Sequence, residues 1–397
     1  MSLAGNCYPA PTTKWDPSPL NANRKIQFDA MVTPLSSIFG SGFLVIVPIL
    51  AAVAGKYSVI AMALVCALAF AVGSVIRFNI RHAEPALAEG HHEVVLSLER
   101  ISDLALVPAY VISVCLYLEI LSSFLLGGLA HKGAVSQDLL TTAIIAIITI
   151  IGLTRGLEPL NFLEAWCLYI TLGIIAVLFV CFGLHDLESW QSHAGLVLVE
   201  LPANSAWALL TVVAGTLIVV QGFETTRYLG GQFDAETRIR ASRWSQVVAS
   251  AIYIAFVALV TPIVHSLGGT YHDNSLIDLT RYAVPFMVVP LIIAAALSQF
   301  SAAVADVITS VGNIEEATGN RIKARFAYIL VGFGAAMLTW SANTFELVAL
   351  ASRAFAFYYL MQCLVAICVT RSPAQRLAFA LVALVLAFVA IFAVPAH

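Results

Sequence analysis

Two apolar stretches decide the fold of this chain: Pro34-Leu-Ser-Ser-Ile-Phe-Gly-Ser-Gly-Phe43 and Ala214-Gly-Thr-Leu-Ile-Val-Val-Gln-Gly-Phe-Glu-Thr-Thr226. Each lies within an apolar segment of membrane-span length, 31–54 and 205–230, and interrupts it near its middle with glycine and polar residues. Inside a bilayer, backbone without helical hydrogen bonds is tolerated only where it is buried in protein or lines a cavity. The interruptions therefore predict two broken transmembrane helices, an arrangement that surrounds a binding site near the membrane midplane.

The composition places the chain in a lipid bilayer. Of its 397 residues, 60% are hydrophobic and 11% are charged, whereas a soluble protein carries about 25% charged residues. The net charge of -3 gives no sign of a nucleic-acid partner, and we expect none. The seven cysteines form no Cys-x-x-Cys pair, so neither a zinc site nor a disulfide framework is predicted.

The number of apolar stretches predicts the number of membrane spans. A crossing helix needs about 20 mostly apolar residues. The chain holds eleven such stretches, at 31–54, 57–79, 103–129, 139–155, 161–184, 205–230, 244–266, 283–313, 325–341, 344–369 and 375–395. The segment 1–30 lacks the apolar core of a cleavable signal, so the first stretch is predicted to act as an uncleaved anchor. We therefore predict an all-α integral membrane protein with about eleven transmembrane helices.

The distribution of Lys and Arg predicts the orientation. With a cytoplasmic N-terminus, sixteen of the 20 basic residues fall in cytoplasmic segments. Three fall on the other side (Lys56, Lys132 and Arg281), and Arg353 lies within a span. Cytoplasmic loops are enriched in Lys and Arg. We expect a multi-pass protein of the plasma (inner) membrane, with its N-terminus in the cytoplasm and its C-terminus outside.

The two interruptions also predict an internal repeat. Gln221 lies 181 residues after Gly40, and five spans separate the two elements in order. Because five is odd, the second unit would be inverted in the membrane relative to the first. We predict a first repeat over 31–185, a second over 205–370 and an additional span within 371–397.

The chemistry of a broken helix suggests what it binds. The outer half of the first span is predicted to begin at Gly40-Ser41-Gly42, with its free N–H groups and the positive end of its dipole facing the centre of the protein. Such an end suits a carboxylate or another small anionic group. Unwound carbonyl groups nearby suit a cation.

Three short segments resemble elements of a known family. Ile38-Phe-Gly-Ser-Gly-Phe43, followed by Pro48, is similar to the Gly-Ser-Gly element in the first helix of amino acid–polyamine–organocation (APC) superfamily transporters. Gln221-Gly-Phe-Glu-Thr-Thr226 resembles that family's sixth helix, and Ser298-Gln-Phe-Ser301 resembles a serine-bearing stretch of its eighth. The resemblance implies the LeuT-type fold, a five-plus-five inverted repeat with helices 1 and 6 broken. One extra C-terminal helix would complete eleven spans, where the family usually has twelve.

The resemblance also implies where a solute and an ion would bind. The implied solute-binding residues are Phe39, Gly40, Ser41, Gly42, Phe43, Gln221, Gly222 and Phe223. The implied cation site consists of Ser36, Phe39, Ser298 and Ser301. Because Ala302 follows Ser301, this site has one hydroxyl fewer than in sodium-coupled relatives. The fifth span also lacks the lysine found in some proton-coupled relatives. The coupling ion therefore stays open between H⁺ and Na⁺, with a slight preference for protons, and no other cofactor is expected.

Few ionisable residues lie within the spans, where each costs about 2.5–3.5 kcal/mol. Glu119 in span 3 and Arg353 in span 10 lie at similar depths, so we predict an ion pair that forms an outer gate or a proton-sensitive switch. A static structural pair and two unrelated residues are the alternatives. Glu224 follows the second interruption and either caps the inner half-helix or handles protons. Asp306 is predicted to line the inner exit path or to cap a water cavity.

A group of histidines and carboxylates follows the second span: His82, Glu84, Glu89, His91, His92 and Glu93. Such side chains can bind divalent metal. Their spacing fits no specific motif, so we interpret the segment as a solvated loop and predict no metal site.

Together these features predict a secondary active transporter and no enzyme. The chain has no GxxxxGK[ST] nucleotide-binding loop, and no span pairs a nucleophile with a base. The expected solute is a small amino acid or a related amine or carboxylate, moved by ion-coupled alternating access. The alternatives are an inorganic ion transporter or channel on the same fold, and a sensor or scaffold. The expected partners are the solute and the bilayer, and the oligomeric state stays open.

Overall fold

The structure is a computed structural model that describes residues 19–40, 42–88, 93–129, 133–157, 160–192, 197–201, 205–319 and 321–396. All regular structure in these residues is helical. The α-helices are α1 (Pro19–Gly40), α2 (Ile46–Ala54), α3 (Ser58–Phe78), α4 (Glu84–Ala88), α5 (Glu93–Gly128), α6 (Ala134–Arg155), α7 (Asn161–Gln191), α8 (Ala206–Ala214), α9 (Ala235–Val260), α10 (Ser275–Ala283), α11 (Val288–Ala317), α12 (Ala324–Thr339), α13 (Thr344–Val369) and α14 (Pro373–Phe392). Short 3₁₀ and π-helical turns join some of them: η1 (Gly55–Tyr57), η2 (Asn79–Ala83), η4 (Leu217–Val220), η5 (Phe223–Leu229), η6 (Thr261–Leu267) and η7 (Pro285–Met287).

Every apolar stretch predicted to cross the membrane is helical. In the part of the chain that the structure describes, eight helical segments are long and apolar enough to span a bilayer. The ninth predicted span is the shorter α12. The first is divided into α1 and α2, and the sixth into α8 and the 3₁₀ segments η4 and η5. The helix α14 follows the tenth span as the predicted extra helix. The all-α membrane fold with broken helices 1 and 6 is therefore confirmed.

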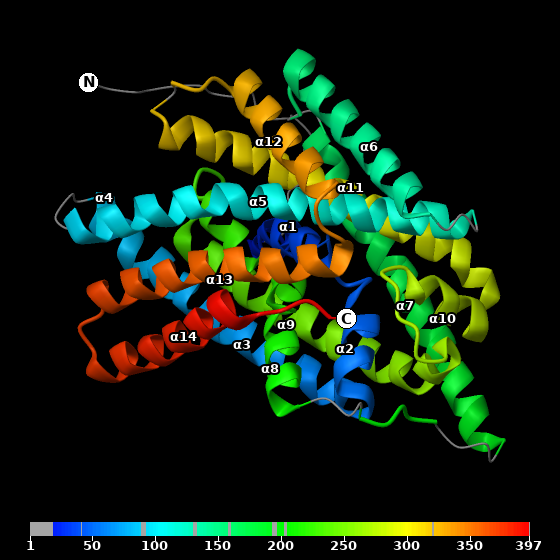
Figure 1. Cartoon of the computed structure of the whole chain (residues 1–397). Helices are drawn as coiled ribbons and strands as arrows, with labels where there is room; N and C mark the ends of the chain where they lie inside the picture. Colours follow the sequence, from blue (N-terminus) through cyan, green and yellow to red (C-terminus); the bar gives the residue numbers. More distant parts are fainter. Residues whose placement is uncertain are drawn as a thin grey trace.

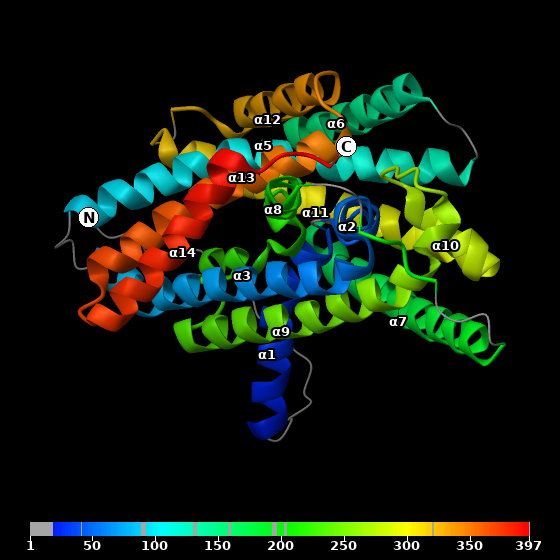
Figure 2. The ribbon, with the colours of Figure 1, turned by 60° about the horizontal axis from the view of Figure 1, so that its bottom comes forward.

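Helix α5 forms the middle of the bundle (Figure 1). In its most apolar part, 72% of the residues are buried, compared with 17% in α6 and 22% in α14. It packs on α11 and α13, and α13 in turn runs beside α14 (Figures 1 and 2). Figure 2 shows α3 lying along α9. Helices α6 and α14 are peripheral, and exposed apolar side chains such as Leu139 and Leu384 suit contact with lipid.

The first broken helix differs from the prediction at both ends. The helix α1 begins at Pro19, before the predicted start of the span, because polar residues outside an apolar stretch can continue a helix. It ends at Gly40 as expected, but α2 begins only at Ile46. Gly42 has a φ of 136°, which favours glycine, and the Val45 N–H donates to its carbonyl oxygen. The second half-helix therefore starts later than Gly40-Ser41-Gly42, because a tight turn forms first.

The second broken helix unwinds over a longer distance. Helix α8 ends at Ala214, and η4 follows before an extended residue, Gln221. Gly222 has a φ of 127°, a value that side chains disfavour, and the 3₁₀ segment η5 starts directly after it. The predicted interruption at Gln221-Gly222 is confirmed, and the irregular backbone reaches back to Gly215.

Side-chain caps begin two of the helices after this break. Asn343 and Glu346 form a capping box at the start of α13. Asp234 caps α9 by accepting a hydrogen bond from the Thr237 N–H at 2.7 Å. Hydrogen bonding by Thr237 lowers the pKa of Asp234. Because the pKa in the folded state is depressed, the cap stabilises the helix at neutral pH, and this contribution is lost as the pH falls through that pKa.

The boundaries of the two predicted repeats, at 31–185 and 205–370, stay predictions. So does the assignment of 371–397 as a separate unit. The helix α14 within it packs on α13, the last helix of the second predicted repeat.

Candidate functional site

The two breaks contact each other at the centre of the bundle. Gly42 lies against the second break, where a Cβ on it would stand 3.0 Å from Val219 Cγ2. Gly222 lies against the end of α1, where a Cβ would stand 2.6 Å from the backbone nitrogen of Ile38 and 2.7 Å from Ser37 Oγ. Each break thus has a glycine at a point where a side chain would collide with the other broken helix. This reciprocity is expected of two related units that pack across a pseudo-two-fold axis.

Tyr253 of α9 forms hydrogen bonds to the backbone of both breaks. Its hydroxyl oxygen lies 2.9 Å from the Ile38 carbonyl oxygen and 2.7 Å from the Val219 carbonyl oxygen, so the two acceptors share one donor. The side chain is fully buried. Helix ends leave carbonyl groups without partners inside the helix. Tyr253 therefore stabilises the unwound backbone of both breaks at once.

We expect Tyr253→Phe to lower the free energy of unfolding by about 1–2 kcal/mol, because it removes the shared donor and leaves the ring packing intact. The measurement is thermal or denaturant unfolding in detergent. Tyr110→Phe is the matched control, because the buried Tyr110 hydroxyl has no hydrogen-bond partner among the described residues. Equal destabilisation by the two variants would contradict the bridging role.

Aromatic rings fill the space around the breaks. Phe39 stacks on Tyr253 with ring centroids 6.0 Å apart, and Phe43 meets Tyr253 edge-on at 5.1 Å. At the second break, Phe223 stacks on Tyr359 at 5.4 Å. All five rings are buried. The predicted solute-binding residues that the structure describes are thus brought together, and in this conformation their rings occupy the centre of the site.

The Glu224 carboxylate joins the second break to its neighbours. It accepts hydrogen bonds from the Gly222 N–H at 2.9 Å, from the Tyr359 hydroxyl at 2.8 Å and from the Gln221 side-chain amide. Gln221 in turn accepts a hydrogen bond from the Tyr117 hydroxyl of α5 at 3.4 Å. Glu224 is fully buried. Its contact with the Gly222 N–H is the geometry of a cap for the broken helix, and its part in proton handling stays a prediction.

Asp306 is buried on α11 and accepts a hydrogen bond from the Ser113 hydroxyl of α5. Among the described residues, neither Asp306 nor Glu224 forms an ion pair with a basic side chain. Two carboxyl groups therefore lie inside the bundle with hydrogen-bond donors but without a countercharge. The predicted position of Asp306 on an exit path or at a water cavity stays a prediction.

The predicted cation-site residues lie where α1 packs on α11. A Cβ on Gly40 would collide with that of Ala302 and would lie 3.4 Å from the Ser298 carbonyl oxygen. The side chains of Ser36, Ser298 and Ser301 are all buried. The Ser298 hydroxyl donates a hydrogen bond within α11. Glycine at position 40 is thus what allows the two helices to approach, and sodium binding between them stays a prediction.

Glu164 of α7 is a further candidate site residue that was not predicted from the sequence. The Thr33 hydroxyl of α1 donates to its carboxylate at 3.2 Å. Glu164 also lines a small pocket together with Ser301 and Cys167. It is the only acidic residue in the predicted fifth span, and that isolation is the signal that could have identified it.

The predicted ion pair between Glu119 and Arg353 is not formed. The buried Glu119 accepts a hydrogen bond from the Gln137 amide at 2.9 Å, and the same amide donates to Asp273 at 3.1 Å. Arg353 is exposed, and its Nε donates to the Ala390 carbonyl oxygen of α14 at 3.0 Å. The prediction was wrong because matching depths do not determine which way two side chains point. Glu119 contacts α6, whereas Arg353 contacts α14.

Asp273 is the central acceptor of a polar cluster that contains Glu119, Gln137, Ser123 and Thr344. It accepts hydrogen bonds from the Ser123 hydroxyl at 2.7 Å and from the Thr344 hydroxyl at 2.6 Å. A pocket of about 280 Å³ lies beside it, lined in part by Ser123 and Gln137. The cluster links α5, α6, the segment before α10 and the start of α13, so it can close this end of the bundle.

A second polar network lies near the other end of α5. Glu99 precedes Glu119 by 20 residues, a separation of about 30 Å along a helix. The Arg227 guanidinium donates to both Glu99 carboxylate oxygens, at 3.1 and 3.2 Å. Gln362 donates to Glu99 at 3.0 Å and accepts a hydrogen bond from the Asn79 amide at 2.8 Å. This network joins η5, α5, α13 and η2 on the opposite side of the breaks.

Several predicted residues fall outside the described part of the chain. Ser41 is one of them, so its implied role in solute binding stays a prediction. From the group after the second span, Glu89, His91 and His92 are also outside. Glu84 of the same group pairs with Arg238, with an N–O distance of 2.7 Å.

A helical membrane bundle whose first and sixth helices are broken and meet at its centre defines a secondary transporter of the LeuT type. Residues 20–393 match the family model described as APC superfamily transporter, and this chain belongs to that superfamily. It is 37% identical over 377 residues to an uncharacterized protein of Aquifex aeolicus (strain VF5), which covers 93% of this chain and 91% of that protein. The family is one of transporters, so the prediction that the chain is not an enzyme is confirmed.

Solved structures share the fold. A mutant of the manganese transporter of Eremococcus coleocola superposes with a TM-score of 0.57 at 11% identity, covering 96% of this chain and 88% of that chain. Mhp1, a nucleobase-cation-symport-1 family transporter, superposes with a TM-score of 0.50 at 14% identity, covering 85% and 77%. At these identities the likeness concerns the fold alone.

Proposed function

We propose that this transporter moves a small organic solute, an amino acid or a related amine or carboxylate, by ion-coupled alternating access. The main support for this proposal is the arrangement of the two breaks, which Tyr253 joins by hydrogen bonds. Phe39, Phe43 and Phe223 surround them. Apolar and aromatic walls with a few polar groups are typical of sites for organic solutes. The polar backbone of the breaks would hold the charged group of the solute, and the rings would pack on the remainder.

We propose protons as the coupling ion, with Glu119 or Glu224 as the carrier. Both carboxyl groups are buried, and neither forms an ion pair among the described residues. Ionisable residues of this kind inside a membrane protein are the usual members of proton relays. Sodium at Ser298 and Ser301 is the competing possibility.

We also propose an orientation in the plasma membrane. The side of the bundle that carries Arg77, Arg227 and Arg238, called the basic side below, would face the cytoplasm. The asymmetry of Lys and Arg between the predicted loops supports this orientation. The N-terminus would then be cytoplasmic and the C-terminus outside.

The test is uptake into liposomes that contain the purified protein. A panel of labelled amino acids, amines and carboxylates is offered under an imposed proton gradient or an imposed sodium gradient. We expect saturable, stereoselective uptake of an organic solute that responds to the proton gradient. Uptake of an inorganic cation alone, for example manganese, would contradict the proposal and support the ion-transporter alternative.

Glu224→Gln is expected to abolish proton-driven accumulation of the solute while the protein stays folded. An amide carries no exchangeable acid proton, and it offers fewer acceptors to the Gly222 N–H and the Tyr359 hydroxyl. The measurement is the pH dependence of uptake in the liposome assay. Asp278→Asn is the control, because Asp278 forms an exposed pair with Arg281. An unchanged pH profile in Glu224→Gln would exclude Glu224 as a carrier.

A further inference from the structure

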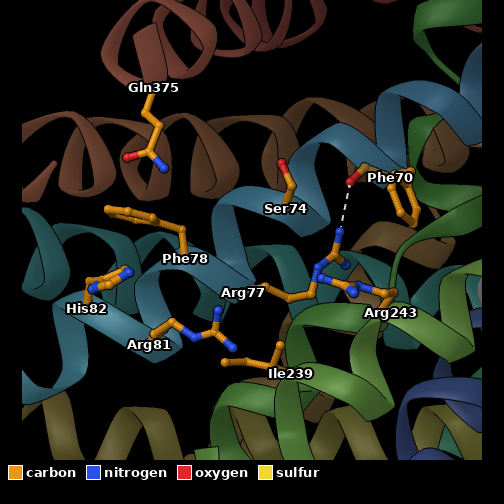
Figure 3. Close-up of a pocket in the computed structure, with 9 residues that line it drawn as sticks. All are labelled: Phe70, Ser74, Arg77, Phe78, Arg81, His82, Ile239, Arg243 and Gln375. Carbon is orange, nitrogen blue, oxygen red and sulfur yellow. Dashed lines mark hydrogen bonds between the residues drawn. The ribbon is translucent and has the colours of Figure 1, made fainter. Parts of the chain in front are cut away.

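A basic pocket with no part in the proposed transport site opens between α3, α9 and α14 (Figure 3). Its volume is about 470 Å³. Its walls combine three arginines, a histidine and two phenylalanines: Arg77, Arg81, Arg243, His82, Phe70 and Phe78. None of the described residues that line it is acidic. The pocket therefore presents positive charge together with apolar surface.

Two of the three arginines have no countercharge within the part of the chain that the structure describes. Arg77 is only 6% exposed and donates to neutral acceptors, the Gln246 side-chain oxygen and the Phe70 carbonyl oxygen. Arg243 forms no ion pair with any residue that the structure describes, and its side chain lies near that of Arg77 (Figure 3). A buried charge without a partner is unfavourable, and a second like charge nearby adds to the cost. An anion in the pocket would remove both penalties.

The third arginine, Arg81, can also bind an anion in the pocket. Arg81 pairs with Glu236, but the two side chains are 49% and 55% exposed. An ion pair of this kind contributes about 0–1 kcal/mol and is easily exchanged for another partner. Basic character also extends beyond the pocket, because an adjoining hollow of about 930 Å³ is lined by Arg371 and Arg376 and shares His82 with it.

The pocket lies where lipid-facing surface ends. Ile60, Leu64 and Phe70 form an exposed apolar row along α3, with 59%, 64% and 39% of their surfaces accessible, and this row leads to the pocket. Trp244, next to Arg243 on α9, is 54% exposed. Tryptophan is enriched at the boundary between the hydrocarbon core and the headgroups. Apolar surface for acyl chains thus adjoins guanidinium groups at headgroup level.

We propose that this pocket binds the phosphate-bearing headgroup of an anionic phospholipid, whose acyl chains lie along the exposed face of α3. Guanidinium groups bind phosphate oxygens in pairs of hydrogen bonds. Basic pockets between membrane helices on the cytoplasmic side are suited to such headgroups. Free phosphate could neutralise the arginines but would leave the apolar row unused. The assignment to the cytoplasmic leaflet rests on the proposed orientation.

The bound lipid has a structural consequence. The pocket is formed by α3 and α9, which lie side by side, by η2 and by Gln375 of α14. A headgroup there links the last helix, outside both predicted repeats, to the second and seventh spans. The lipid therefore stabilises the contact between α14 and the rest of the bundle on the basic side.

The test compares lipids on the delipidated full-length protein in a mild detergent. Thermal unfolding is followed during titration with phosphatidylglycerol, with phosphatidylcholine and with inorganic phosphate, and retained lipid is detected by native mass spectrometry. Arg243→Gln is the test variant, because Arg243 is exposed and its loss disturbs no described ion pair. Arg281→Gln is the matched control, an exposed arginine distant in the chain that pairs with Asp278.

Phosphatidylglycerol is expected to stabilise the wild type and Arg281→Gln, and to bind Arg243→Gln roughly tenfold more weakly, since a lost hydrogen bond to a charged group is of that size. Equal binding to Arg243→Gln and wild type overturns the proposal. So does equal stabilisation by phosphatidylcholine, or an equal shift with inorganic phosphate alone. No transported solute is needed, so this result and the uptake result can fail independently.

Discussion

Replacing Gly222 by alanine is expected to abolish transport and to destabilise the protein by about 2–6 kcal/mol. The φ of 127° at this position is one that an alanine adopts only with strain. The added Cβ would also stand 2.6 Å from the backbone nitrogen of Ile38. Backbone atoms cannot rotate away as a flexible side chain can, so the two breaks must separate. The measurements are thermal unfolding in detergent and uptake into liposomes.

Gly312→Ala is the matched control for this substitution. Gly312 lies in α11, is exposed, and has open space where a Cβ would be placed. Alanine is a better helix former than glycine by about 0.5–1 kcal/mol, so this variant should be neutral or more stable. If Gly222→Ala kept wild-type stability and transport, the close contact between the breaks would have no importance for the native state.

Replacing Arg227 by alanine is expected to lower the free energy of unfolding by about 3–5 kcal/mol. Arg227 and Glu99 form a buried pair whose side chains are 12% and 7% exposed. The substitution leaves the Glu99 carboxylate inside the protein, and among the described residues the Gln362 amide is its one remaining donor. It also removes the ion pair that joins η5, the segment after the second break, to α5. Unfolding by denaturant or heat measures the loss.

Arg281→Ala distinguishes this effect from the loss of any arginine. Its pair with Asp278 has side chains 51% and 39% exposed, so its removal should cost less than about 1 kcal/mol. A second variant, Arg227→Met combined with Glu99→Leu, removes both charges and should recover much of the lost stability. If Arg227→Ala and Arg281→Ala lowered the free energy of unfolding by similar amounts, burial of the Arg227–Glu99 pair would make no special contribution to stability.

The breaks could be predicted because their cause is local. A glycine or a polar residue within an apolar run is visible in the sequence itself, and both interruptions lie where they were expected. The start of α2 at Ile46 was missed, because the number of residues in a turn depends on what packs against it. Here the neighbour is Val219 of the other break.

The contacts of the candidate site were less predictable. Glu224 was identified from its place after the break, but its bond from Tyr359 joins residues 135 positions apart. Tyr253 resembles any other tyrosine in an apolar helix until the fold brings two carbonyl groups to its hydroxyl. The depths of Glu119 and Arg353 were read from the sequence, whereas the direction of each side chain around its helix was not. That rotation depends on which helices pack together.

The membrane class, the spans, the two breaks and the short segments that resemble APC superfamily transporters could all be predicted from the amino-acid sequence alone. These features depend on composition, periodicity and local backbone preference, which neighbouring residues specify. The partners of the buried carboxylates depend instead on how the helices pack. Packing brings Glu119 to Gln137 rather than to Arg353, and it places Arg77 and Arg243 in one pocket. The physical reason is that hydrogen bonds and charge pairs act over a few ångströms. Their partners are therefore set by helix rotation and packing, which no single segment of the chain specifies.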